Sequence, residues 1–258
     1  MKRSLSVSTR ARRLVASGAA FAVVLGATDA SAIEFGTRAS EHPFRSPQNF
    51  ELELRISPYY PQIDDDPNLN GQTPFLKNFG DVARVSVGLE FDWQMFRIPH
   101  VGTIGPGFGV AYVGMSRDVV TVSGRASGDS TKLSIYPFFA DAVLRVDTFW
   151  HDAGIPLVPY GKAGLGLGLW RASNASGTAV ANGVNGKGAS WGTSFALGVQ
   201  FALDAIDQGA SRNMDNSTGI NNTYVFIEES WLALNGIGQQ NALHVGSNTW
   251  VAGLAFEF

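Results

Sequence analysis

Charged side chains recur at every second residue in several segments of the chain, opposite apolar side chains. In "FELELRIS", Glu51, Glu53 and Arg55 share one parity and apolar residues occupy the other. Successive side chains of an extended strand point to opposite faces, so this spacing gathers the charges on one face. The residues with this pattern are Glu51, Glu53, Arg55, Arg84, Glu90, Asp92, Asp141, Arg145, Lys162 and Glu257.

Charges of both signs on one face can form ion pairs where water is excluded, and unpaired buried charges are costly. If the strands close into a narrow barrel, these side chains would fill its lumen, because eight strands leave room for little else. The pattern therefore predicts a lumen plugged by a charge network. A small conducting pore is the alternative.

Residues 66–71 resemble the opening half of a calcium loop. Asp66, Asn68 and Asn70 supply oxygens at alternate positions, and Gly71 allows the sharp turn. The twelfth position of such a loop should be a bidentate Glu, but here it is Lys77. A solvated acidic loop is the better interpretation, and no metal or other cofactor is predicted.

Ser and His residues near the outer leaflet raise the possibility of a lipid hydrolase. The spacing of His244 and Ser247 does not put both on one face of a strand, and His100 and His151 fall in turns expected at the opposite side. A lipid-modifying barrel enzyme is thus a weaker alternative, and we predict a protein that is not an enzyme.

The elements that would position the charges are eight alternating segments separated by turn-rich stretches. The alternation predicts that Leu52, Leu89, Leu144, Leu167, Val199 and Phe256 face outward. In the seventh segment, Glu228 and Glu229 are adjacent, so its register stays open.

The connections alternate in length. Those at 58–81, 116–131 and 171–190 are long and polar, whereas those at 96–103 and 147–156 are shorter. With both termini in the periplasm, the long connections would be extracellular, as outer-membrane barrels require. The connection at about 204–221 breaks the rule, and "LDAIDQGASRNMD" suggests a short helix there.

Composition agrees with a β protein that has an apolar exterior. Charged residues make up 16% of the 258 residues, aromatic residues make up 11%, and there are 30 Gly. After Ala32 no run of about 18 apolar residues occurs, so any membrane crossing would use strands. The chain has no Cys, which excludes disulfides and thiolate metal sites.

Residues 1–32 read as a secretory signal peptide. A basic segment that ends in Arg12 and Arg13 precedes an apolar run from about Leu14 to Ala27, and Ala30-Ser31-Ala32 supplies a cleavage site. Cleavage after Ala32 removes five of 19 basic residues and one of 22 acidic residues, so 14 and 21 remain and the formal net charge is −7. An acidic chain argues against nucleic acid as a partner.

The pattern resembles small outer-membrane β-barrel proteins of Gram-negative bacteria, of the eight-stranded OmpA/OmpX type, over residues 50–258. More narrowly, "ELELRISPYYPQID" and "FGDVARVSVGLEFDWQ" resemble a myxobacterial outer-membrane barrel family of unassigned activity. The resemblance implies the cell outer membrane as location and outer-membrane lipid as partner. It also implies that Trp250, Leu254, Phe256 and Phe258 form the signal read by the barrel-assembly machinery.

Together these features predict an all-β protein with a signal peptide at 1–32, a periplasmic lead at 33–49 and a closed antiparallel transmembrane barrel of eight strands at 50–258. The expected function is a structural or surface-interaction role, carried out as a monomer. What the extracellular loops bind cannot be read from their residues.

Overall fold

The computed structural model of the chain describes residues 49–120, 126–181, 183–239 and 242–258. The predicted signal peptide and residues 33–48 of the predicted lead lie outside these ranges.

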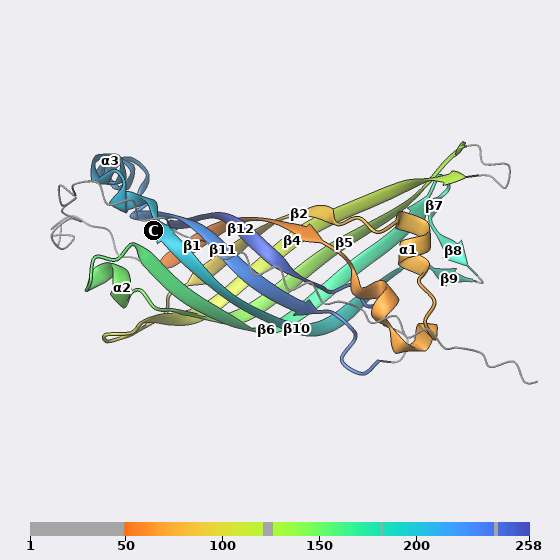
Figure 1. Ribbon diagram of the computed structural model, residues 1–258, viewed down its shortest axis with the longest axis horizontal. Coiled ribbons are helices and arrows are strands. Elements are labelled where there is room, and N and C mark those ends of the chain that lie inside the picture. The colour runs from red at the N-terminus through yellow and green to blue at the C-terminus, as the bar shows by residue number, and fades with distance from the viewer. Residues whose placement is uncertain (1–48, 121–125, 182, 240–241) are drawn as a thin grey trace, which may run out of the picture. The chain divides into compact units, whose positions relative to one another are not determined.

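Eight long antiparallel strands form one closed sheet in the described part of the chain (Figure 1). They are β1 (Phe50–Tyr59), β2 (Arg84–Trp93), β4 (Gly102–Val120), β5 (Ala126–Arg145), β6 (Leu157–Asn174), β10 (Lys187–Ala202), β11 (Asn222–Ala233) and β12 (Ser247–Glu257). Short strands add to the connections: β3 (Phe96–Ile98), β7 (Gly177–Thr178), β8 (Val180–Ala181) and β9 (Val184–Asn185).

Helices occupy both ends of the barrel (Figure 1). One end, called the α1 end below, holds η1 (Gln62–Asp65), η2 (Pro67–Leu69) and α1 (Pro74–Phe79). The other, called the α3 end, holds α2 (Thr148–His151), η3 (Leu203–Ala205) and α3 (Gln208–Thr218). The helix expected in the long connection at 204–221 is therefore present as α3. No helix in the described ranges is long and apolar enough to cross a membrane.

The barrel closes where the first and last strands pair. β1 pairs with β12 through Leu52 opposite Phe256 and Leu54 opposite Leu254, and β10 pairs with both β6 and β11. This confirms the predicted closed antiparallel barrel of eight strands.

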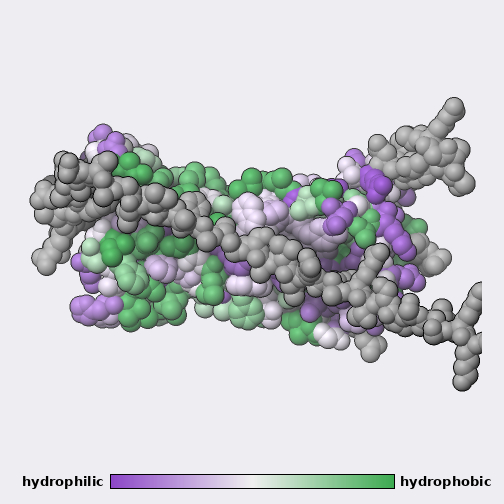
Figure 2. Space-filling model, in the orientation of Figure 1, coloured by the Kyte–Doolittle hydropathy of each residue, from purple (hydrophilic) through white to green (hydrophobic). Residues whose placement is uncertain are grey.

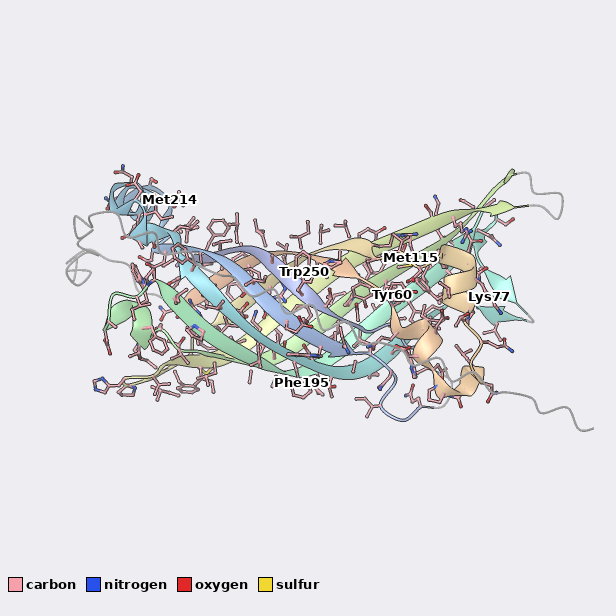
Figure 3. All side chains as sticks on the ribbon, viewed as in Figure 1. Tyr60, Lys77, Met115, Phe195, Met214 and Trp250 are labelled. Carbon is pink, nitrogen blue, oxygen red and sulfur yellow. The ribbon has the colours of Figure 1, made fainter. Side chains whose placement is uncertain are left out.

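The two parities of each strand face different surroundings. Leu89 is 48% exposed on the outside, whereas its neighbour Glu90 is 1% exposed inside. All six residues predicted to face outward have the outward parity. Apolar residues gather over the strands on the face shown in Figure 2, and hydrophilic residues increase toward the α1 end. Phe195, which is 50% exposed, points away from the barrel (Figure 3).

The structure assigns the register of the seventh barrel strand, β11. Tyr224, Phe226 and Glu228 are buried inside, while Ile227 and Glu229 face outward. Glu229 lies opposite Trp250 of β12 in the ladder.

Four strands are longer than the sequence indicated. The predicted connection at 116–131 consists largely of strand, because β4 continues to Val120 and β5 begins at Ala126. Similarly, β6 and β10 extend into the predicted connection at 171–190. A strand of about 9–11 residues crosses a membrane, but β5 has 20 residues. Residues 116–118 of β4 and 130–132 of β5 are all polar, so the alternation that marks a strand disappears there.

An apolar cluster, called the cap below, fills the barrel at the α1 end. Its buried members are Tyr59, Ile63, Phe75, Val113, Met115, Leu133, Ile135, Leu232, Leu234 and Val245. Tyr60 and Met115 mark this region in Figure 3. Gly168 makes room for the cap, since a Cβ there would lie 2.5 Å from Val245 Cγ2. The predicted charge network therefore does not extend into this half of the barrel.

Replacing Phe258 with Asp is expected to reduce the amount of folded protein in outer membranes. The ring packs across the closing seam, 6.1 Å from Phe50 and 6.5 Å from Phe91 between centroids. A charge near the edge of the apolar band costs only about 0–1 kcal/mol in stability. A much larger loss of folded protein, scored by heat-modifiable migration on gels, would therefore fit the predicted assembly signal.

Phe96→Asp is the matched control, because Phe96 is 62% exposed and lies on β3 at the same end of the barrel. Phe75 is unsuitable, since it is buried in the cap. Normal folded yield of Phe258→Asp would leave its ring as an ordinary exterior aromatic.

Candidate functional site

Nine of the ten predicted lumen residues point into the barrel, in the half next to the α3 end. The strand pairing sets neighbours: Glu51 lies opposite Asp92 and Glu257, and Glu53 lies opposite Glu90. Like charges directly opposite each other destabilise a sheet unless cations intervene. Three cations from three different strands lie among these carboxylates.

Arg55 of β1 contacts three carboxylates. Its guanidinium forms ion pairs with Glu53, Glu90 and Glu228. The guanidinium carbon also lies 5.3 Å from the centroid of the Phe139 ring and 5.8 Å from that of Phe226. Arg55 therefore joins charges from β1, β2 and β11 across the lumen.

Lys162 of β6 binds the same carboxylates from the opposite wall. Its Nζ lies 2.9 Å from Glu53 Oε2, 2.9 Å from Glu90 Oε2 and 3.7 Å from Glu228 Oε2. The side chain is 1% exposed. Two cations thus share three glutamates in this layer.

Arg145 of β5 forms a second layer, closer to the α3 end. Its Nη1 lies 2.8 Å from Glu51 Oε2 and 3.1 Å from Glu257 Oε1, and its Nη2 donates to Gln200 Oε1 at 2.8 Å. Glu257 also accepts hydrogen bonds from Gln94 at 2.8 Å and from Tyr224 at 2.9 Å. These hydrogen bonds help to compensate the buried charge of Glu257, because Arg145 is shared with Glu51.

Arg84 does not join the network, contrary to prediction. It is the first residue of β2, at the α1 end, and donates to the backbone carbonyls of Val82 and Phe79 at 3.0 and 3.1 Å. Its parity is inward, but apolar residues of the cap separate this level of the lumen from the charges.

Asp92 and Asp141 reach the interior but form no ion pair within 4.0 Å in the described part of the chain. Asp141 Oδ2 accepts a hydrogen bond from Ser194 Oγ at 3.0 Å. Asp92 is 2% exposed, and neither of its carboxylate oxygens receives a hydrogen bond from a described residue.

Several lumen residues were missed from the sequence. The sequence does not identify Glu228 as inward, because its neighbour Glu229 obscures the parity of β11. Tyr160, whose hydroxyl donates to Glu228 at 2.9 Å, and Gln200, whose Nε2 donates to Glu51 at 2.6 Å, are uncharged. Their inward parity was the available signal.

The residues weighed for calcium binding or hydrolysis have other contacts. Asp66 accepts hydrogen bonds from the backbone and side-chain nitrogens of Asn68, at 2.9 and 3.0 Å, and so caps η2. Ser247 Oγ accepts from the backbone nitrogen of Tyr60 at 3.1 Å. His100 Nδ1 lies 3.9 Å from Asp152 Oδ2 at the α3 end.

The four residues of the predicted assembly signal share the outward face of β12 and its end. Trp250 is 51% exposed, Leu254 40% and Phe258 37%, and Phe256 is partly exposed.

The space between the cap and the charge network is small. It is a cavity of about 50 Å³, bounded by Arg55 on one side and by Tyr59 and Leu232 on the other. Two side-chain layers of different chemistry therefore block the lumen in series.

A basic groove lies outside the barrel, where β5 and β6 extend toward the α1 end. It encloses about 500 Å³ and is lined by Lys132, Arg171, Tyr136 and several serines. Lys187 of β10 lies opposite Arg171 in the ladder and is also exposed. Among the described side chains that line this groove, the charged ones are basic.

Solved structures similar to the chain include small barrel proteins. Ail, the attachment invasion locus protein of Yersinia pestis, solved with the heparin analogue sucrose octasulfate, is 13% identical with a TM-score of 0.42, covering 82% of this chain and 97% of Ail. Neisserial surface protein A is 16% identical (TM-score 0.41; 83% and 98% covered). The outer membrane protein OprG from Pseudomonas aeruginosa is 12% identical (TM-score 0.45; 83% and 97% covered).

Identities and TM-scores this low say nothing about the function of this chain. The assignment of the fold is based on the strand pairing described above. A scan against models of protein families finds no match, and a search of curated proteins finds none either.

Replacing Arg55 with Met is expected to lower the free energy of unfolding by about 3–5 kcal/mol, because it leaves buried carboxylates with one cation fewer. Arg84→Met is the control and should change that free energy by about 0.5 kcal/mol, as is usual outside a buried network. Urea unfolding of the two proteins in detergent provides the comparison. Equal losses would mean that the ion pairs of Arg55 contribute no more than the two backbone hydrogen bonds of Arg84.

Proposed function

We propose that the chain is an outer-membrane β-barrel that conducts no solutes and acts through its outer surface. The closed sheet with apolar residues outside and polar residues inside supports a barrel surrounded by lipid. The observation that carries the functional part is the double obstruction of the lumen by the cap and the charge network.

The obstruction favours this role over the pore alternative. A conducting path would have to displace the ion pairs of Arg55 and Lys162 and also the packed side chains around Leu234. Displacing buried ion pairs leaves uncompensated charge, which is strongly unfavourable. The strand extensions at the α1 end would then serve as a rigid platform outside the membrane.

The basic groove suggests what this platform contacts. Lys132, Arg171 and Lys187 lie on the outward face of the extensions, beyond the ring of Tyr136, and tyrosines are typical of the membrane interface. Cations at this height would meet phosphate groups of outer-leaflet lipid. We therefore assign outer-membrane lipid headgroups as the partner of this groove.

Planar-bilayer recordings of the purified protein test the closed lumen. We expect no steady current above that of a bilayer given detergent alone. Leu234→Ala, which thins the cap, should be equally silent because the charge network remains. Reproducible open-channel currents from the unaltered protein would support the pore instead.

Phosphorus analysis of protein extracted from outer membranes in mild detergent tests the lipid contact. Replacing Lys132, Arg171 and Lys187 together with Ser should remove most of the co-purified lipid phosphorus, because no basic side chain is left in the described groove. Lys77→Ser is the control, since Lys77 is an exposed cation of α1 at the same end but outside the groove (Figure 3). Equal phosphorus in all three proteins would refute the assignment.

A further inference from the structure

The described lumen holds more negative than positive groups. Its buried carboxylates are Glu51, Glu53, Glu90, Asp92, Asp141, Glu228 and Glu257, seven in all. Its cations are Arg55, Arg145 and Lys162, three in all. Four negative charges are left over in a lumen that admits little water, and buried charge without compensation is costly.

The surplus is concentrated along one line across the sheet. Glu257, Glu51 and Asp92 are direct neighbours on β12, β1 and β2, and all three point inward. Arg145 lies between the first two. Asp92 has no corresponding cation from the described residues.

Asp92 is also poorly satisfied by hydrogen bonds. Both carboxylate oxygens are buried and receive none from the described residues, and Glu51 Oε2 and Glu90 Oε1 likewise accept none. For Glu51 Oε2, Arg145 is 2.8 Å away but lacks hydrogen-bond geometry. Buried polar groups without a hydrogen bond are rare in proteins, and a bound ion is one explanation for them.

The neighbouring strand β4 leaves space for the side chain of Asp92. Gly107 is its ladder partner on β4, and a Cβ at this position would lie 2.3 Å from Asp92 Oδ1 and 3.2 Å from Glu90 Oε1. A glycine here thus allows the carboxylates to approach the backbone closely.

We propose that Glu51, Glu53 and Asp92 bind a divalent cation inside the barrel. One carboxylate oxygen from each residue lies within 4.8 Å of the others. A set of oxygen ligands without nitrogen or sulfur suits a hard cation, Ca²⁺ or Mg²⁺. Two positive charges would offset half of the surplus and give Asp92 its missing partner.

The site is independent of the proposed surface function, since it requires only that the lumen fold as described. Its competitor is the proton: the excess carboxyl groups could be neutral acids instead. Compensation by a metal ion predicts that added metal ion binds and stabilises the protein, whereas protonation of the carboxyl groups predicts that it does not.

Equilibrium dialysis of the full-length chain, extracted folded from membranes in detergent and dialysed against EDTA, separates them. We expect the protein to retain or rebind about one Ca²⁺ or Mg²⁺ per chain, and Ca²⁺ to raise its thermal unfolding midpoint. Asp92→Asn, which keeps the shape of the side chain, should bind less than about a tenth of this amount. No metal bound by the unaltered protein, and no shift of its midpoint, would mean that protons neutralise the surplus.

Two further variants locate the cation. Asp66→Asn removes a carboxylate of the acidic loop and should leave binding unchanged; loss of binding there but not in Asp92→Asn would overturn the lumen site. If Asp92→Asn does not fold, Gly107→Ala provides the test, because its methyl group crowds Asp92 Oδ1 without changing any charge. Full binding by folded Gly107→Ala would contradict the site.

Discussion

The narrow lumen of an eight-stranded barrel requires every inward charge to be compensated by a cation, a hydrogen-bond donor or a bound ion. Water cannot supply the solvation that an isolated carboxylate needs there, so compensation must come from cations or hydrogen-bond donors. In this barrel Arg55, Lys162 and Arg145 are placed where carboxylates of adjacent strands face each other. Cross-strand neighbours that would repel each other are thereby held together.

The interior is divided by chemistry along the barrel axis. Toward the α3 end the inward ionised and amide groups lie among buried apolar and aromatic residues such as Val158 and Tyr224, and toward the α1 end the cap holds only apolar and aromatic residues. The division follows connectivity: the long connection after β1 folds Ile63 and Phe75 into the barrel mouth, where they pack on β4 and β5. An apolar cap on this side keeps water from the charge network, so its ion pairs act in a low-dielectric setting where loss of one partner is most costly.

Much of the fold follows from local alternation, which any strand with one apolar face displays. Leu52, Leu89 and Phe256 were placed outside correctly because each lies in a run of strict period two. The cap was not foreseen, since Val113 and Leu133 continue an inward parity whose earlier members are small or polar, and because Ile63 and Phe75 come from a connection without periodicity. Arg84 was misplaced for the same reason: parity gives the face of a residue but not its depth along the barrel.

The adjacent residues Glu228 and Glu229 of β11 do not follow the alternation of polar and apolar residues, so the sequence pattern leaves the register of this strand open. One of Glu228 and Glu229 must face outward. With Glu228 inside, its carboxylate meets Arg55 and Tyr160, and the apolar side chains of Val225, Ile227 and Trp231 lie outside. A slip by one residue would exchange all of these positions: Glu229 would replace Glu228 inside, and the tyrosine and phenylalanine at 224 and 226 would turn outward.

The cost of the observed register is the outward carboxylate of Glu229. That cost depends on depth, falling from the middle of the membrane to the interface, and is smaller for Glu than for Arg or Lys. Glu229 lies opposite Trp250 and two residues before Trp231, and tryptophans of this kind are typical of the interface. In the proposed membrane barrel, this position exposes the carboxylate near the membrane surface, where its penalty is small. The observed register thus pairs Glu228 inside, keeps the apolar residues of β11 outside and leaves a single outward charge.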